Sequence, residues 1–290
     1  MFVSFVKLAR PSQWLKNGVV LAALIFSGEA IHTVATEIAV IAVFIFCLLS
    51  SSVYILNDLI DCDKDRRHPL KKDRPIASGR VSKSAAMVYC AGLLVIALGG
   101  AWFINSSFFV VSLLFFGLNL SYSFWLKNIV IVDAMSIAVG FVIRAYAGAF
   151  AIGVPASKWL LINTLFLALF LAFGKRRHEL VFLEGDAASH RTILSKYSPY
   201  LLDQLIGVVT ASVAVVYMLY TFSPEVSSKL GTENLFVTIP FVVYGIFRYL
   251  YLIHKEERGG SPTEVLISDR PILINVILWL ATVVAVLYIA

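Results

Sequence analysis

A run of acidic side chains follows the second long apolar segment and carries the clearest chemical signal in the sequence. Asn57, Asp61 and Asp65 recur every four residues, and Asp58 stands beside the first of them. If the segment continues as a helix beyond the membrane, the four-spaced residues project within an arc of about 80°. Carboxylates on one face repel unless a cation separates them, and Mg²⁺ is commonly held by one or two carboxylates plus substrate phosphates. The alternative interpretation is a solvated charged loop near a helix end.

The spacing predicts two overlapping roles for these residues. We expect Asn57, Asp58, Asp61 and Asp65 to be ligands of Mg²⁺ that binds a diphosphate. Asp58, Asp61 and Asp65 are then the predicted catalytic side chains.

Basic side chains follow the acidic ones and return later in the chain. Lys71 and Arg74 come soon after Asp65, and Lys175, Arg176 and Arg177 follow another apolar segment. Arginine forks suit phosphate oxygens, and lysine supplies a point charge. We predict that these five cations contact phosphate groups. For the later three, an anchor at a helix end, where the dipole favours cations, is an equally good interpretation.

Membrane helices must position these residues. The chain is 59% hydrophobic and 14% charged, whereas a soluble domain carries about 25% charged residues. Continuous apolar runs favour helices over a barrel. We predict an all-α polytopic membrane protein with one domain, residues 1–290, and nine spans. The expected spans are about 13–30, 35–57, 83–104, 108–126, 130–151, 157–176, 200–221, 235–254 and 270–289.

The distribution of Lys and Arg predicts the orientation. With nine spans and the N-terminus in the cytoplasm, all 24 of these residues lie on the cytoplasmic side except Lys158, Lys229 and Arg144. Cytoplasmic loops of membrane proteins are enriched in Lys and Arg. We therefore expect a protein of the cytoplasmic (inner) membrane with its active site on the cytoplasmic face. No nucleic-acid partner is expected.

Several further polar residues stand where the predicted spans meet the cytoplasm. Gln13 and Lys16 could close the site from the first span. Tyr122 and Lys127 end the fourth span, where Lys127 would contact a phosphate and Tyr122 would orient it. An interfacial tyrosine and a snorkelling lysine are the alternative. Asp133 opens the fifth span and could orient Lys127 or a ribose hydroxyl, or only face the helix dipole.

Two other charged residues have structural interpretations as well as functional ones. Arg144 lies well inside the fifth span, where a charge usually faces a cavity or a partner. It could bind a phosphate or pin two helices, and the second role is the favoured one. Asp269 precedes Pro271 and is predicted to cap the last helix, with a role in substrate binding as the less favoured alternative.

The acidic motif also resembles a known family. Asn57-Asp58-x-x-Asp61-x-x-x-Asp65 resembles the first motif of UbiA-type membrane prenyltransferases. The resemblance implies nine helices, a cytoplasm-facing cavity and Mg²⁺-diphosphate chemistry. Most such enzymes carry a second aspartate-rich motif after the sixth span, but here that place reads Gly174-Lys175-Arg176-Arg177-His178-Glu179. A second magnesium is therefore in doubt, and additional anionic groups are favoured.

Four separate segments are similar to one branch of that family, the polyprenyl-phosphate phosphoribosyltransferases. They are "RPSQWLKN" from Arg10, the basic run from Arg66 to Gly79, "DAMSIAVGFVIRAYAGA" from Asp133, and "KRRHE" from Lys175. The resemblance implies that phosphoribosyl diphosphate and a polyprenyl phosphate are the substrates. The alternatives are a prenyltransferase that acts on an aromatic ring and, less favoured, a transporter. Lipid length, downstream glycan and oligomeric state stay open.

Overall fold

Long apolar runs form the helices of this protein, as the sequence predicts. The structure is a computed structural model that describes residues 2–67, 71–182, 193–256 and 260–289, and no strand occurs among them. Within these ranges, eight helical segments are long and apolar enough to cross a membrane, so the all-α prediction is confirmed. They are α3 (Thr33–Ile60), α5 (Lys83–Ile104), α6 (Ser106–Phe124), α7 (Val132–Ala151), α8 (Lys158–Phe182), α10 (Pro199–Thr221), the 3₁₀ helix η5 (Asn234–Thr238) continued by α12 (Ile239–His254), and α14 (Arg270–Tyr288).

The first predicted span, residues 13–30, does not form one long α-helix. It consists of the 3₁₀ helix η1 (Pro11–Leu21) and the short helix α2 (Ala22–Phe26), and Gly28 then turns the chain with a φ of 85°. The preceding residue Arg10 has a left-handed backbone. Asn17 inside η1 is fully buried and bonded to side chains of other helices. Those tertiary contacts are invisible to a hydropathy profile, and the count of nine spans stays a prediction.

Shorter helices connect the long ones, and side-chain caps mark several helix starts. The connecting elements are α1 (Phe2–Ala9), η2 (Glu29–Ile31), α4 (Cys62–Arg67), η3 (Leu126–Asn128), η4 (Leu194–Lys196), α11 (Pro224–Leu230) and α13 (Pro262–Ser268). Ser82, Asn105 and Ser198 accept hydrogen bonds from backbone N–H groups of α5, α6 and α10. Asp269 accepts from Ile272 N at 3.0 Å, so its predicted role as the cap of α14 is confirmed.

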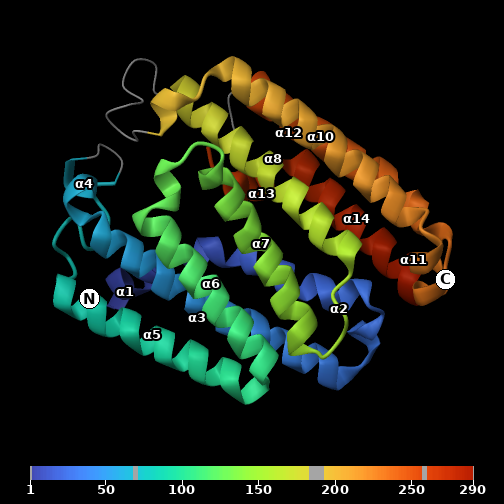
Figure 1. Ribbon diagram of the computed structural model, residues 1–290, viewed down its shortest axis with the longest axis horizontal. Helices are drawn as coiled ribbons and strands as arrows, with labels where there is room; N and C mark the ends of the chain where they lie inside the picture. Colours follow the sequence, from blue (N-terminus) through green and yellow to red (C-terminus); the bar gives the residue numbers. More distant parts are fainter. Residues whose placement is uncertain (1, 68–70, 183–192, 257–259, 290) are drawn as a thin grey trace. The chain divides into compact units, whose positions relative to one another are not determined.

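The chain divides into two compact units, each with a core of its own. The first consists of residues 1–24, 33–127 and 143–156. In it α3 lies along α5 and packs against η1 (Figure 1). Phe46, Phe108 and Phe115 are fully or almost fully buried, and the ring of Phe46 lies 5.7 Å and 5.3 Å from the other two rings. A second cluster, which includes Leu8, Ile55 and Ile76, packs around the end of α3 where the acidic motif begins.

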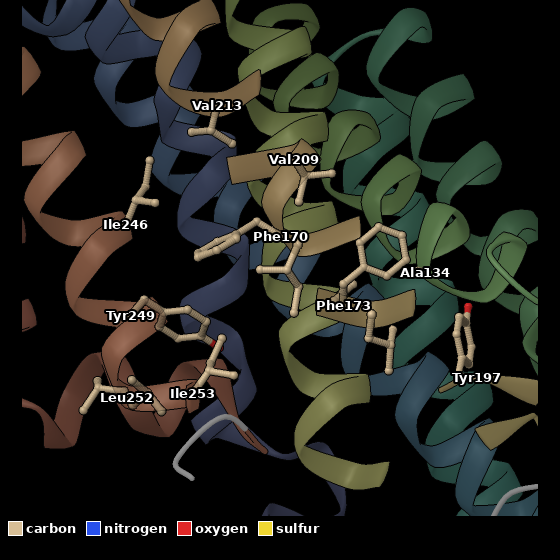
Figure 2. Packing of buried hydrophobic residues seen from close by; sticks show 14 of the residues in the cluster. Ala134, Phe170, Phe173, Tyr197, Val209, Val213, Ile246, Tyr249, Leu252 and Ile253 are labelled. Atoms are coloured by element: carbon tan, nitrogen blue, oxygen red, sulfur yellow. The ribbon is translucent and has the colours of Figure 1, made fainter. Parts of the chain in front are cut away.

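The second unit consists of residues 25–32, 128–142 and 157–290. Here α8 lies along α10, and α12 packs on α14. Phe170 of α8 and Tyr249 of α12 contact each other within the core, with ring centroids 5.3 Å apart (Figure 2). A Cβ at Gly174 would lie 2.7 Å from Cδ1 of Ile253. The packing of α8 against α12 therefore favours glycine immediately before the basic residues at 175–177.

Many of the exposed side chains on the long helices are large and apolar, as a lipid environment requires. On α5, Val88 is 74% exposed and Phe103 is 88% exposed. Such surfaces would cost free energy in water, at roughly 25 cal/mol per Å². The protein is an integral membrane protein.

Candidate active site

The acidic motif lies on a helical stretch, which confirms the predicted continuation of the second span. Backbone N–H groups of Asp61 and Asp65 donate to the carbonyl oxygens of Asn57 and Asp61, at 2.9 Å and 2.8 Å. These i to i−4 hydrogen bonds show that the backbone stays helical where α3 ends and α4 begins. Asn57, Asp61 and Asp65 are therefore held on similar helix faces.

Asp58 and Asp65 form a buried ion cluster with two arginines. Nη1 of Arg74 donates to Oδ1 of Asp58 at 2.9 Å and to Oδ2 of Asp65 at 2.6 Å. Nη2 of Arg10 donates to the same Asp58 oxygen at 2.5 Å. The two carboxylate side chains are only 3% and 5% exposed. Two acids and two guanidinium groups meet in this cluster, so each buried charge has a partner of opposite sign.

Asp61 is the most accessible carboxylate of the motif. Its side chain is 30% exposed, and Nζ of Lys127 lies 3.1 Å and 3.3 Å from its two oxygens. Lys127 belongs to η3. Asn57 accepts a hydrogen bond from the hydroxyl of Ser123, near the end of α6. The fold thus brings six predicted site residues together: Asn57, Asp58, Asp61, Asp65, Arg74 and Lys127.

The donor atoms of this group fit magnesium in chemical type. Carboxylate and amide oxygens are the hard ligands that Mg²⁺ prefers. Within the described ranges, no three His, Cys, Asp or Glu side chains gather closely enough to hold a metal ion. The carboxylates instead face cations of the chain itself. A bound ion would have to share or replace these partners, most readily at Asp61.

Four more predicted residues belong to the first unit. Gln13 and Lys16 are on η1, Lys71 follows α4, and Tyr122 is near the end of α6. All four side chains are partly exposed. Their predicted contacts with substrate stay predictions.

Asp133, the first acid of α7, lies in a buried network of the second unit. Its Oδ2 accepts from Nε of Arg176 at 2.7 Å, and its Oδ1 accepts from the hydroxyl of Tyr197 at 2.7 Å. Arg176 also donates from Nη1 to Glu179 at 2.7 Å. The side chains of Asp133 and Arg176 are 0% and 2% exposed. Burial raises the pKa of Tyr197, and its hydrogen bond to Asp133 raises it further.

The other two basic residues at the end of α8 are less buried. Nζ of Lys175 lies 3.7 Å from Oε1 of Glu179. Nε of Arg177 donates to Oδ1 of Asp203 at 2.5 Å, and Nε2 of His254 lies 3.2 Å from the same oxygen. Lys175, Arg176 and Arg177 belong to the second unit, whereas the acidic motif at residues 57–65 belongs to the first. That both groups face one cavity stays a prediction.

Sequence reasoning missed three partners of the predicted residues. Arg10 neutralises Asp58, Tyr197 donates to Asp133, and Glu179 accepts from Arg176. Glu179 lies three residues after Arg176 on one helix, a spacing that brings side chains together. Arg10 and Tyr197 are 48 and 64 residues from their partners, and no local pattern marks them.

Arg144 has a structural environment inside α7. Its Nε donates to Oδ1 of Asn17 at 2.9 Å, and its guanidinium lies 4.5 Å from the centroid of the Phe115 ring. Ser50 donates to the same Asn17 oxygen at 3.1 Å. Four residues on, a Cβ at Gly148 would lie 1.9 Å from the carbonyl oxygen of Val20. These contacts join α7 to η1 and agree with the favoured prediction that Arg144 pins helices.

The protein is all-helical among the described residues, with helices long enough to cross a membrane, and its acidic motif resembles that of UbiA-type prenyltransferases. Residues 18–266 match the model of the UbiA prenyltransferase family. The chain belongs to this family.

Individual proteins support the same relationship. The chain is 34% identical to a decaprenyl-phosphate phosphoribosyltransferase of Mycolicibacterium smegmatis, over 98% of this chain and 92% of that protein. It is 33% identical to the protein of that name from Mycobacterium tuberculosis strain H37Rv, over 96% and 92% of the two chains. A solved UbiA homolog from Archaeoglobus fulgidus, bound to GPP and Mg²⁺, is 20% identical with a TM-score of 0.73. That match covers 98% of this chain and 99% of the other.

Proposed function

We propose that this protein transfers the 5-phosphoribosyl group of phosphoribosyl diphosphate to a polyprenyl phosphate and releases diphosphate. The observation that carries the proposal is the 34% identity, over nearly the whole of both chains, to a decaprenyl-phosphate phosphoribosyltransferase. The basic Lys175-Arg176-Arg177 sequence, at the place where the resemblance to UbiA-type enzymes leads us to expect a second acidic motif, supports it further. Both substrates of this reaction bring phosphate groups, whereas an aromatic acceptor need not.

The reaction needs little proton transfer. An oxygen of the lipid phosphate forms a bond to C1 of the ribose, and the bond from C1 to the diphosphate breaks. The diphosphate leaves with the bonding electrons. Because the lipid phosphate is already ionised at neutral pH, no strong general base is required. Catalysis then depends on positioning and on charge stabilisation.

The acidic motif is proposed to bind the diphosphate end of the donor. Asn57, Asp58, Asp61 and Asp65 would hold Mg²⁺, and Asp61 is the most accessible of the three carboxylates, at 30% side-chain exposure. When bound, Mg²⁺ offsets negative charge on the leaving diphosphate. Lys127, beside Asp61, has three donor hydrogens and can contact a phosphate oxygen without leaving the carboxylate.

Arg74 is suited to the same task. It uses only Nη1 for Asp58 and Asp65, while a guanidinium has five N–H donors. Its anchored nitrogen would hold the group in place while other N–H bonds point at a phosphate. Lys71, Gln13, Lys16 and Tyr122 are proposed to complete the contacts with substrate.

The basic end of α8 is proposed to attract the remaining phosphate groups. Lys175 is 42% exposed and Arg177 is 16% exposed at the side chain. Arg176 would act beside them from its ion pairs with Asp133 and Glu179. We do not assign the ribose 5-phosphate and the lipid phosphate to individual cations.

The proposed topology has nine crossings, with the N-terminus and the active site at the cytoplasmic face. An 11-residue 3₁₀ helix rises about 22 Å at roughly 2.0 Å per residue. The five residues of α2 add about 7.5 Å. Together η1 and α2 reach about 30 Å, the thickness of a bilayer core.

We further propose that residues 1–290 act as one transferase domain, since the family match extends over both units.

The alternative activity is prenyl transfer to an aromatic ring. A solved relative with the same fold is bound to GPP, a prenyl diphosphate, and Mg²⁺, so prenyl transfer is the activity to test against the proposal. Membranes that contain the protein, incubated with labelled phosphoribosyl diphosphate and polyprenyl phosphate, separate the two. A labelled, acid-labile lipid that disappears with EDTA is expected. If no label enters lipid, the proposal fails.

A further inference from the structure

The turn before α7 has a strained backbone. Ile131 has a φ of 68°, and among the described residues Arg10 is the only other non-glycine residue with positive φ. A β-branched residue in this region is a genuine outlier. Ile131 is 40% exposed, so its side chain is not part of a buried core that would hold the strained backbone in place. Such strain persists only where surrounding contacts impose it.

Tyr197 supplies the contact that holds this turn. Its hydroxyl accepts a hydrogen bond from the backbone N–H of Ile131 at 2.7 Å. The same hydroxyl donates to Oδ1 of Asp133 at 2.7 Å. Tyr197 is 5% exposed and stands just ahead of α10, whose N-cap is Ser198. One buried phenol therefore connects the strained residue to the acid two positions further on.

The connection continues to the basic end of α8. Asp133 holds Nε of Arg176 with its second oxygen, and Arg176 holds Glu179. Glu179 also lies 3.7 Å from Nζ of Lys175. A displacement of the turn at Ile131 would move Asp133 and withdraw an ion-pair partner from Arg176. The cations on either side of Arg176 are those that we propose to bind phosphate.

We propose that Tyr197 is a positioning residue for phosphoribosyl transfer: by clamping the strained turn at Ile131 it fixes Asp133, and through Asp133 the basic end of α8. The inference rests on the function proposed above. It assigns Tyr197 no contact with substrate. A merely structural tyrosine would lower stability when altered, but its loss would not be repaired by relieving strain at another residue.

The test compares three variants of the full-length protein. Tyr197→Phe removes both hydrogen bonds and keeps the ring. Ile131→Gly makes the positive φ intrinsically accessible. The third variant combines them. Tyr200→Phe is the matched control, since Tyr200 lies three residues away and is 75% exposed.

Transfer of label and amide hydrogen exchange are measured on the same preparations. We expect Tyr197→Phe to lower kcat about 10-fold, the small end of the range for residues that orient a site, with KM changed less. The N–H of Ile131 should exchange faster in this variant. The double variant should regain most of the lost kcat, and Tyr200→Phe should match wild type.

The outcomes separate this inference from the proposed function. Unchanged exchange at Ile131 in Tyr197→Phe overturns the clamp. Faster exchange with unchanged kcat, or no recovery in the double variant, overturns the positioning role. If the wild-type protein transfers no label, the proposed function fails and the positioning role fails with it, while the exchange data still decide whether the clamp exists.

Discussion

Nζ of Lys127 contacts both carboxylate oxygens of Asp61, at 3.1 Å and 3.3 Å, across 66 residues of the chain. Asp58 and Asp65 are buried with arginines, whereas the Asp61 side chain is 30% exposed. The three acids of the motif thus have unequal environments. The accessible acid is suited to the metal and the substrate, and the two buried acids are suited to holding arginines in place.

Asp61→Asn should lower the rate of transfer strongly. The change keeps the size of the side chain but removes the charge that would hold Mg²⁺, and a loss of about 100-fold in kcat/KM is expected for one charge-stabilising group. Asp63→Asn is the control, since Asp63 lies two residues on with a side chain 72% exposed. It should retain activity within about two-fold. Equal losses in both variants would contradict the assignment.

Arg74→Met should destabilise the protein as well as slow it. The change leaves Asp58 and Asp65 with one fewer cation in a buried setting. We expect a loss of roughly 2–3 kcal/mol, below the usual 3–5 kcal/mol for a buried pair because the Arg74 side chain is 29% exposed. Thermal unfolding in detergent measures it against Arg67→Met, an exposed residue of α4. A loss no larger than in that control would show that the buried cluster is unimportant.

Gly148→Ala should disrupt the packing of α7 on η1. The new Cβ would lie 1.9 Å from the carbonyl oxygen of Val20, a backbone atom that cannot rotate away. A cost of about 2 kcal/mol or more is expected from overpacking. Gly117→Ala in α6 meets nothing within 4 Å and should be neutral or stabilising by up to about 1 kcal/mol. Similar melting temperatures for the two variants would argue against the close approach.

Arg144 and Asn17 should behave as a coupled pair. Asn17→Ala removes the acceptor of Arg144 Nε, and Arg144→Met removes the donor. If the pair pins η1 to α7, the double variant should lose about 1 kcal/mol less stability than the sum of the single variants. A double-mutant cycle from unfolding in detergent measures this coupling. Strict additivity would assign the arginine another role.

The stabilising effect of Tyr197 should persist to high pH. Its pKa is raised by burial and by its hydrogen bond to Asp133, so the neutral form is favoured in the folded state. The contribution of neutral Tyr197 to the free energy of unfolding is fully present below the ordinary tyrosine pKa of about 10. It is lost as the pH rises through the higher pKa that Tyr197 has in the folded state. The stability difference between wild type and Tyr197→Phe should be equal at pH 7 and pH 9. A decline between those values would point to a different titrating group.

Much of this fold follows from local sequence patterns. Apolar runs predicted nine spans, and eight of these correspond to the long helices of the described residues. The four-residue spacing of Asn57, Asp61 and Asp65 predicted their shared face. Asp269 could be identified as a cap because it precedes an apolar run with Pro271 in the first turn. These features depend on neighbours within one or two helical turns, so the sequence contains the necessary information.

The partners of the site residues could not be predicted in this way. The pairing of Arg10 with Asp58, and of Tyr197 with Asp133, depends on how helices pack. The 3₁₀ form of η1 likewise coincides with contacts of Asn17 to Ser50 and Arg144. Predicted phosphate ligands such as Arg176 turned out to be ion-paired within the chain. A sequence shows which residues are charged, but tertiary packing decides which charges meet.

The choice of donor tests the central claim most directly. Purified protein in lipid vesicles is given labelled phosphoribosyl diphosphate with polyprenyl phosphate and, in a parallel reaction, labelled geranyl diphosphate with 4-hydroxybenzoate. Products are identified by mass spectrometry. We predict a phosphoribosylated polyprenyl phosphate formed in equal amount with diphosphate, and no prenylated ring. A prenylated ring without any phosphoribosylated lipid would contradict the proposed function.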